Sequence, residues 1–135
     1  MKKILVVEDD KLLLEYLKHC LETENCVTVT AENKETALKW IKETRFDLAL
    51  LDLELPDGNG MEICATLKGN PRTRSTPVII LTGNNSNDAR IKSNLDAKAD
   101  LFLNKPIDPA DLREAARKLL DSSEKRKLLL RAQYS

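Results

Sequence analysis

The chain has 135 residues, a length that suits one domain and leaves no room for a second globular unit of similar mass. Its 22 Lys and Arg residues balance its 22 Asp and Glu residues, so no overall positive charge exists to capture nucleic acid or an anionic membrane. Hydrophobic residues make up 41% of the sequence and charged residues 33%, a balance that favours a folded domain over a disordered chain.

Targeting and membrane signals are weak in this sequence. The longest apolar runs, such as Val78–Leu81, fall far short of the roughly 20 residues that a membrane span needs. The N-terminal run Ile4–Val7 is shorter than the hydrophobic region of a signal peptide. The three cysteines lack Cys-x-x-Cys spacing and predict neither a disulfide framework nor a zinc site. We therefore expect a cytoplasmic protein without a membrane segment.

Five short apolar runs follow one another along the chain and predict five strands. They are Ile4–Val7, Val27–Ala31, Asp47–Leu51, Pro77–Leu81 and Asp100–Leu103. Between them, apolar residues recur three and four positions apart, a spacing typical of amphipathic helices. The predicted helices include Leu13–Leu21, Ala37–Ile41, Gly60–Lys68, Asn87–Leu95 and Leu112–Leu120. Asp108 before Pro109 marks the start of the last helix, as N-cap and first helical residue.

Alternation of strands and helices five times over predicts an α/β fold. Parallel neighbouring strands need crossover connections, so the helices should cover both faces of a parallel sheet. The near-continuous hydrophobicity of the strands agrees with burial on both faces. We expect a flavodoxin-like, doubly wound sheet of five parallel strands in the order 2-1-3-4-5, with five helices, and a ligand site beyond the carboxyl ends of strands 1 and 3.

The C-terminal segment differs in charge from the rest of the chain. Residues 122–135 carry a net charge of +3, and residues 1–121 sum to −3. We expect one domain over 1–121, followed by a basic helical extension or linker stub over 122–135. The alternatives for the apolar residues Leu128–Leu130 are packing against the domain or a contact between two copies of the chain, which would make a homodimer.

Polar residues follow four of the predicted strands. Glu8 and Asp9 follow the first strand, Asp52 the third, Thr82 the fourth and Lys105 the fifth. Because parallel strands end at one rim of the sheet, these side chains should meet there. The acids at the end of the first strand would repel phosphate, and no Gly-rich loop is present, so the pattern argues against a nucleotide pocket.

Carboxylates brought together at this rim need a cation. Two unit charges 4 Å apart repel by about 4 kcal/mol at an effective dielectric of 20. An all-oxygen site without His or Cys is typical of Mg²⁺. With the ion present, a free oxygen of Asp52 can attack a phosphoryl donor and form an aspartyl phosphate. Lys105 can then pair with the product, and the Thr82 hydroxyl can donate a hydrogen bond to it.

Each of these residues also has a purely structural interpretation. We prefer helix capping for Asp10 and the shaping of its own turn for Asp57. Thr82 alone could simply end a strand, and Lys105 alone could be a solvated amine. Asp52 is harder to dismiss, because it directly follows the apolar run Leu48–Leu51. The functional interpretation depends on the set and not on any single residue.

The sequence resembles the receiver domain of two-component response regulators. The resemblance covers about Lys2 to Asp121 and is carried by Ile4–Asp10, Asp47–Gly60 with its Asp-Leu-Glu-Leu-Pro-Asp-Gly run, Val78–Gly83 and Phe102–Pro106. It implies that Asp52 accepts a phosphoryl group from a phosphohistidine on a histidine kinase or phosphotransfer protein. It also implies that Glu8, Asp9, Asp52 and the backbone carbonyl of Glu54 hold Mg²⁺.

The resemblance assigns further roles. Thr82 and Lys105 match the hydroxyl and amine that contact the phosphoryl group. Thr82 and Phe102 match the switch residues, whose movement in relatives accompanies activation. Glu54 and Asn84 occupy two variable positions that tend to set how quickly the phosphoryl group hydrolyses.

Three local features bear on how well the resemblance holds. The first acid is Glu8, where Asp is commoner, and its longer arm should still bind the metal, directly or through water. Lys98 stands where relatives usually have Gly, and a left-handed backbone there would cost roughly 1 to 2 kcal/mol. The Lys105–Pro106 peptide is expected to be cis, as is typical of the family.

The resemblance therefore implies a phosphorelay signalling switch and not an enzyme acting on external substrates. A downstream protein would read the face around the fourth helix, the fifth strand and the fifth helix. Nucleic-acid binding by this chain is not expected, because the residues after Asp121 are too few for a helix-turn-helix domain. One alternative is a dehalogenase-like phosphohydrolase, although Glu54 stands where that class needs a second Asp. The other is a pseudo-receiver, an interaction module that is never phosphorylated.

Overall fold

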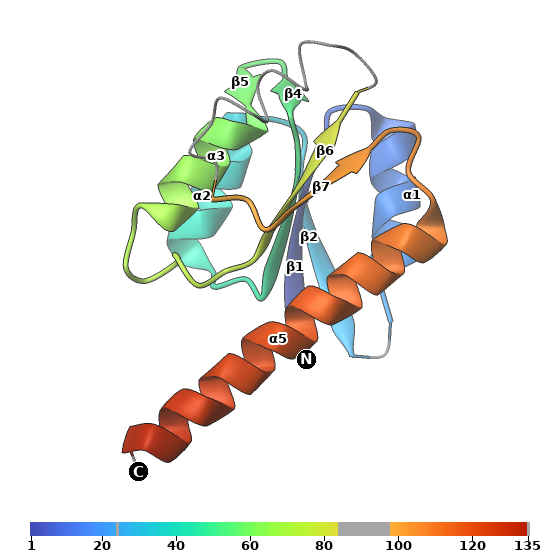
Figure 1. Ribbon diagram of the computed structural model, residues 1–135. Coiled ribbons are helices and arrows are strands. Elements are labelled where there is room, and N and C mark those ends of the chain that lie inside the picture. The colour runs from blue at the N-terminus through green and yellow to red at the C-terminus, as the bar shows by residue number, and fades with distance from the viewer. Residues whose placement is uncertain (24, 84–97, 135) are drawn as a thin grey trace.

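The computed structural model describes residues 1–23, 25–83 and 98–134 of the protein (Figure 1). Its central sheet has five parallel strands in the order β2-β1-β3-β6-β7. These strands are β1 (Lys2–Val7), β2 (Cys26–Ala31), β3 (Leu48–Asp52), β6 (Val78–Thr82) and β7 (Leu101–Asn104). The predicted order 2-1-3-4-5 is therefore confirmed, since β6 and β7 are the fourth and fifth of the strands predicted from the sequence.

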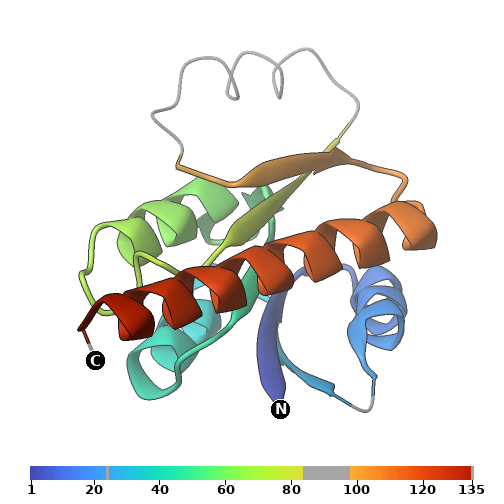
Figure 2. The ribbon, with the colours of Figure 1, turned by 60° about the horizontal axis from the view of Figure 1, so that its bottom comes forward.

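Helices cover both faces of this sheet (Figures 1 and 2). They are α1 (Lys11–Leu21), α2 (Lys34–Glu43), α3 (Gly60–Lys68) and α5 (Pro109–Tyr134). One face carries α1 and α5, and the other carries α2 and α3. The described part of the chain thus contains four of the five predicted helices, and the helix predicted over Asn87–Leu95 lies outside the described residues.

The core consists of two apolar layers, one on each face of the sheet. Along β1, Ile4 and Val6 pack toward α1 and α5, whereas Leu5 and Val7 pack toward α2 and α3. This alternation follows from the two-residue repeat of a strand. Of the three inner strands, β3 and β6 are buried along their whole length and β1 is buried from Ile4 to Val7, while β2 and β7, at the two edges of the sheet, are partly exposed. Burial on both faces is therefore confirmed for the inner strands only.

Side chains cap the starts of all four described helices, with Asn59 at the start of α3. Asp10 accepts hydrogen bonds from the backbone N–H groups of Leu12 and Leu13, as the capping interpretation predicts. Asp108 likewise accepts from the second and third residues of α5. Asn33 caps α2 through the N–H of Thr36. Because the first turn of a helix leaves its N–H groups without intrahelical partners, each of these caps stabilises a helix start.

The strand boundaries differ from the predicted ones by one or two residues. β6 begins at Val78 because Pro77 has no N–H to donate to the ladder. β3 extends to Asp52, which pairs with Leu81, and the N–H of Leu53 still donates to the Leu81 carbonyl. The short antiparallel hairpin of β4 (Glu54–Leu55) and β5 (Gly58–Asn59) was not predicted, because two-residue strands leave no periodic pattern in a sequence.

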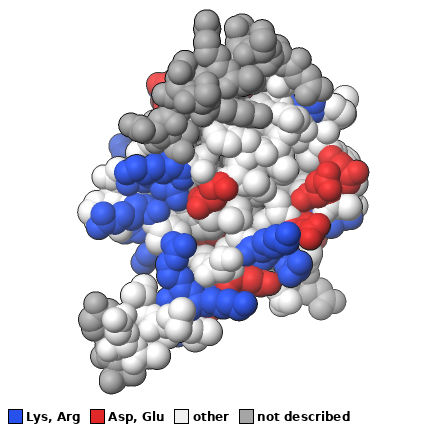
Figure 3. Space-filling model, viewed as in Figure 1, with Lys and Arg blue, Asp and Glu red and all other residues white. Residues whose placement is uncertain are grey.

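The residues after Asp121 continue α5 without a break as far as Tyr134. Ion pairs of Lys2 with Glu124 and of Lys127 with Asp47 hold this part of α5 against the amino ends of β1 and β3. Leu128–Leu130 are exposed. When the molecule is viewed as in Figure 1, Lys and Arg side chains gather over the middle and lower part of this face, with acidic side chains between them (Figure 3). No helix within the described ranges is long and apolar enough to span a membrane.

One expectation about the backbone can be compared with the structure. The Lys105–Pro106 peptide is cis, as expected. The φ angle of Lys98 depends on residue 97, which lies outside the described residues, so the conformational cost considered for Lys98 stays a prediction.

Truncation of the core provides a test of this packing. The change Leu50→Ala removes a fully buried side chain from the layer beneath α1 and α5. We expect it to lower the free energy of unfolding by about 2 to 5 kcal/mol, because a cavity is left behind. Leu129→Ala, which alters an exposed leucine of α5, should change it by less than about 0.5 kcal/mol. Urea unfolding followed by circular dichroism measures both, and equal effects would contradict the assigned core.

Candidate functional site

An acidic pocket opens at the carboxyl ends of β1 and β3. It has a volume of about 480 Å³. Its charged lining residues are Glu8, Asp9, Asp10, Asp52, Glu54 and Lys105, and the rest of the lining comes from Leu53, Leu55, Pro56 and Gly83. The pocket therefore lies at the switch point of the sheet, where the sequence predicts it.

Three carboxylates converge in this pocket. Glu8, Asp9 and Asp52 each offer an oxygen within 4.8 Å of the other two. Glu8 and Asp52 are almost completely buried, with 1% and 3% of their surface exposed, whereas Asp9 is exposed. Negative charges held this close and shielded from water repel one another strongly, so the pocket requires positive charge.

Lys105 supplies positive charge from the loop after β7. Its Nζ atom lies 3.1 Å from Oε1 of Glu8 and 3.1 Å from Oδ1 of Asp52. Burial disfavours the charged form of this amine, but the contacts with Asp52 and Glu8 outweigh burial and raise the pKa of Lys105 above its ordinary value. Lys105 is therefore an ammonium ion that bridges two carboxylates, and the interpretation of it as a solvated amine is wrong.

Glu8 is the most strongly perturbed acid of the pocket. Burial raises the pKa of Glu8 from 4.5 to about 7, and the nearby charge of Asp52 adds to the rise. The N–H of Asp10, 3.1 Å from Oε2, and the ammonium of Lys105 act in the opposite direction. Loss of water around the carboxylate thus outweighs its favourable contacts.

One atom of the pocket lacks a full complement of partners. Oε1 of Glu8 is buried and receives no hydrogen bond from the described residues; its close charged neighbour is the Lys105 ammonium. A buried carboxylate oxygen of this kind is suited to a metal ion, and the three convergent carboxylates offer the oxygen donors that Mg²⁺ prefers. Glu54, the first residue of β4, lines the same pocket. The residues present therefore fit a hard divalent cation.

Thr82 lies next to this pocket but its hydroxyl does not point into it. The side chain is fully buried at the end of β6, and Oγ1 lies 2.7 Å from Oδ1 of Asn104 and 3.4 Å from the carbonyl of Leu103. Asn104 is the register partner of Thr82 on β7. Sequence reasoning missed this contact, although aligning the ends of the fourth and fifth strands would have placed the two residues opposite each other.

Phe102 and Asn84 are the remaining residues singled out from the sequence. Phe102 lies in the middle of β7, partly buried, and packs against the apolar layer beneath α2 and α3. It does not line the acidic pocket. Asn84 lies outside the described residues, so its expected influence on hydrolysis stays a prediction.

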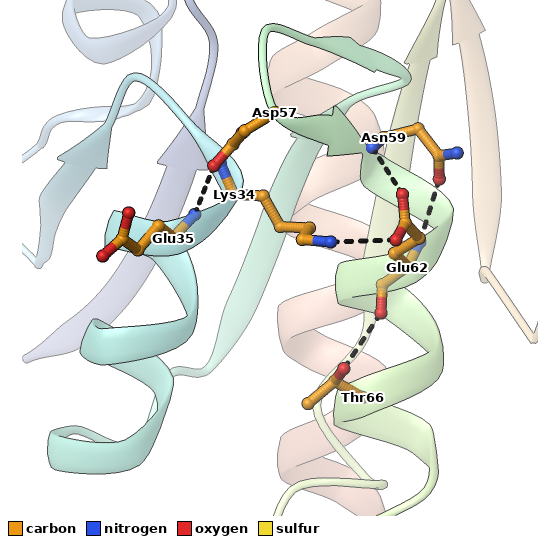
Figure 4. A network of polar contacts seen from close by, with 6 residues as sticks. All are labelled: Lys34, Glu35, Asp57, Asn59, Glu62 and Thr66. Atoms are coloured by element: carbon orange, nitrogen blue, oxygen red, sulfur yellow. Dashed lines mark hydrogen bonds and ion pairs between the residues drawn. The ribbon is translucent and has the colours of Figure 1, made fainter.

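A polar network anchors the loop that forms one wall of the pocket (Figure 4). The Asp57 carboxylate accepts hydrogen bonds from the N–H groups of Lys34 and Glu35, at 2.7 and 2.9 Å. These contacts lower the pKa of Asp57. The Lys34 ammonium binds Glu62, which forms a capping box with Asn59 at the start of α3. Asp57 therefore does more than shape its own turn, because its carboxylate also binds the start of α2, 22 and 23 residues earlier in the chain.

Gly60 fixes the approach of α3 to the buried acid. A Cβ atom at this position would lie 2.4 Å from the backbone carbonyl oxygen of Asp52, which is closer than van der Waals contact permits. The N–H of Gly60 donates to the carbonyl of Leu53. Only glycine therefore lets the first turn of α3 pack against the end of β3.

The fold and the pocket together define a class: doubly wound α/β proteins with an acidic, lysine-bridged site at the switch point of the sheet. Residues 4–117 match the response regulator receiver domain family, and the chain belongs to this family. Proteins of this family are receiver domains of two-component signalling, and they bind Mg²⁺ at an acidic pocket. The resemblance inferred from the sequence is confirmed.

Individual relatives agree with this assignment. The chain is 35% identical over 111 residues to the phosphate regulon transcriptional regulatory protein PhoB of Escherichia coli, covering 82% of this chain and 48% of PhoB. It is 38% identical over 123 residues to the E. coli transcriptional regulatory protein CpxR, covering 91% of this chain and 51% of CpxR. The chain thus spans about half the length of the curated relatives it matches.

Solved structures show the same fold. A CheY-like receiver domain protein from Methanospirillum hungatei has a TM-score of 0.82 and 34% identity, with coverage of 93% of this chain and 98% of that one. The receiver domain of a signal transduction histidine kinase from Syntrophus aciditrophicus has a TM-score of 0.83 and 34% identity, with coverage of 90% and 92%. The fold therefore occurs at comparable length as a separate domain.

The raised pKa of Glu8 predicts how metal-free stability depends on pH. Between about pH 4.5 and 7 the folded protein holds a proton on Glu8 that the unfolded chain has lost. The contribution of Glu8 to the free energy of unfolding therefore falls as pH rises through this window and is constant above it. Relative to Glu8→Gln, the wild type should lose stability between pH 5 and 7, measured by urea unfolding at a series of pH values.

A second carboxylate provides a control of opposite sign. The ion pair with Lys34, helped by the N–H of Asn59, lowers the pKa of Glu62. Its stabilising contribution is therefore present above the unfolded pKa and is lost as pH falls through the lower, folded pKa. Relative to Glu62→Gln, the wild type should lose stability on acidification. A stability difference between wild type and Glu8→Gln that stays constant from pH 4 to 8 would contradict the raised pKa of Glu8.

The anchor at Asp57 is testable through the amides it binds. Asp57→Ala removes both acceptors, so the backbone N–H groups of Lys34 and Glu35 should exchange with solvent faster. Hydrogen exchange followed by NMR measures this change. Glu32→Ala, which removes one negative charge beside the same helix start, serves as the control and should leave the two amides protected. Unchanged exchange in Asp57→Ala would show that the carboxylate does not hold α2.

Proposed function

We propose that this protein is a phosphoacceptor switch whose acceptor is Asp52. The observation that carries the proposal is the Lys105 ammonium bound between two buried carboxylates, Glu8 and Asp52. The Lys105 ammonium places positive charge next to a nucleophilic oxygen of Asp52, and it can form an ion pair with a phosphoryl group added there. Membership of the receiver family supports the same assignment.

The chemistry is a phosphoryl transfer that forms an acyl phosphate on Asp52. An oxygen of the Asp52 carboxylate attacks the phosphorus of a phosphohistidine, the new O–P bond forms as the P–N bond breaks, and the imidazole leaves with the electron pair of that bond. Lys105 orients the carboxylate beforehand and pairs with the phosphoryl oxygens afterwards. Burial of Asp52 excludes bulk water from the acyl phosphate. The chain itself supplies orientation and charge, and the histidine supplies the phosphoryl group.

Mg²⁺ is the proposed cofactor of this transfer. Glu8, Asp9, Asp52 and the backbone carbonyl of Glu54 would hold it. When bound, the ion supplies charge that offsets the negative charge of the transferring phosphoryl group. The convergence of three carboxylates and the partly unsatisfied Oε1 of Glu8 support this proposal.

Partners and cell compartment follow from the same proposal. The donor would be a histidine kinase or phosphotransfer protein in the cytoplasm. The output would be a protein that reads the face formed by β7 and its neighbouring helices, where Phe102 and Thr82 change position on phosphorylation. Glu54 and Asn84 would tune the lifetime of the acyl phosphate. We also propose that residues 1–121 form the receiver domain and that residues 122–135 form its helical extension.

Replacement of the acceptor tests this function. Asp52→Asn should reduce labelling by a small phosphodonor such as acetyl phosphate to the background level, because the amide is not a nucleophile. The wild type should be labelled only with Mg²⁺ present, and a chelator added before the phosphodonor should prevent labelling. Asp111→Asn, the same change on exposed α5, should label like the wild type. Labelling of Asp52→Asn at the wild-type stoichiometry would exclude Asp52 as the acceptor.

A further inference from the structure

The fully buried hydroxyl of Thr82 has one proton and already uses it. Oγ1 donates that proton to Oδ1 of Asn104 across 2.7 Å, a short hydrogen bond between neutral groups. The carbonyl of Leu103, at 3.4 Å, is a second and more distant acceptor. Since a buried hydroxyl without a partner is costly, this bond fixes the direction of the Thr82 side chain.

Backbone hydrogen bonds hold Thr82 in place on β6, so its hydroxyl can change direction only by rotation of the side chain. Thr82 and Asn104 are register partners at the ends of β6 and β7, and the N–H of Lys105 donates to the Thr82 carbonyl at 2.7 Å. On the other side of β6, Asp52 pairs with Leu81, the residue before Thr82. Thr82 therefore stands between β7, which holds its hydroxyl now, and β3, which carries the proposed phosphoacceptor.

One proton cannot serve both sides. A hydroxyl that donates to a phosphoryl oxygen on Asp52 must first give up Asn104. Asn104 is exposed at the end of its strand, so water can replace the hydroxyl as its partner after release. The cost of the exchange is therefore close to the net value of one neutral hydrogen bond.

We propose that Asn104 is a positioning residue that holds the Thr82 hydroxyl away from the phosphoryl site, and so weakens the binding of a phosphoryl group or its mimic at Asp52. This inference rests on the proposed function of Asp52 and on Thr82 as its phosphoryl contact. Asn104 acts only through Thr82 and does not touch the phosphoryl group. Phe102 lies two residues earlier on the same face of β7.

The test measures affinity for beryllofluoride, a phosphoryl mimic, at saturating Mg²⁺. Asn104→Ala leaves the Thr82 hydroxyl without its acceptor in the free protein and leaves its contact in the bound protein unchanged. The variant should therefore bind beryllofluoride about 2- to 10-fold more tightly than the wild type, the range of one neutral hydrogen bond. Titration followed by NMR, with the Lys105 amide as the probe, gives the dissociation constant. Asn104→Leu, which also lacks the acceptor, should behave in the same way.

A double-mutant cycle separates this mechanism from a general loosening of the fold. In a Thr82→Ala background no hydroxyl remains to be released, so Asn104→Ala should leave the affinity unchanged. Asn70→Ala is the matched control, since it removes an asparagine that accepts a hydrogen bond from Arg72 in a distant loop, and it should bind like the wild type. Urea unfolding confirms that each variant is folded.

The possible results distinguish the role of Asn104 from the proposed role of Asp52 as phosphoacceptor. Wild-type affinity or weaker binding in both Asn104 variants overturns the inference and leaves the acceptor assignment standing, provided that Asp52→Asn abolishes binding. An equal gain in affinity with and without the Thr82 hydroxyl also overturns it, because Asn104 would then act by another route. Absence of Asp52-dependent binding in the wild type overturns the proposed function and the inference together.

Discussion

The repulsion between the buried carboxylates of Glu8 and Asp52 is the constraint on which the site depends. Burial disfavours the charged form of both carboxylates, and the Lys105 ammonium, 3.1 Å from an oxygen of each, stabilises their negative charge. The pKa values of Glu8 and Lys105 are both raised, Glu8 chiefly by burial and Lys105 by its contacts with the two carboxylates, so both groups bind protons more tightly than they would in water. A divalent cation or a phosphoryl group that binds in this pocket would change the balance of charge among Glu8, Asp52 and Lys105.

Much of the surrounding fold serves to bring these three groups together. The core beneath and above the sheet fixes β1 and β3 side by side, so that their terminal acids meet at one rim. Gly60 allows α3 to approach the backbone of Asp52, and Asp57 ties the adjoining loop to α2. The rigidity of the pocket therefore comes from contacts that lie outside it.

The hydrophobic pattern was sufficient to predict the strand order and the location of the site, because alternating strands and helices permit few arrangements and polar residues at strand ends must share a rim. The pattern was insufficient wherever a single side chain contacts a distant element. Asp57 reads as a turn residue because its partners on α2 lie 22 and 23 positions earlier in the chain. The hydroxyl direction of Thr82 depends on Asn104, which only strand register reveals.

The uninterrupted course of α5 has a mechanical consequence. Its 26 residues form a helix about 39 Å long that begins four residues after Lys105 and extends past the amino ends of the strands (Figure 1). Ion pairs at Glu124 and Lys127 provide a fulcrum near the amino ends of the strands. A tilt of the helix by about 5° around this fulcrum would displace its start, about 22 Å away, by about 2 Å, and the exposed leucines beyond Glu124 by less than about 1 Å, so the two ion pairs restrain the far terminus against movement beside the acidic pocket.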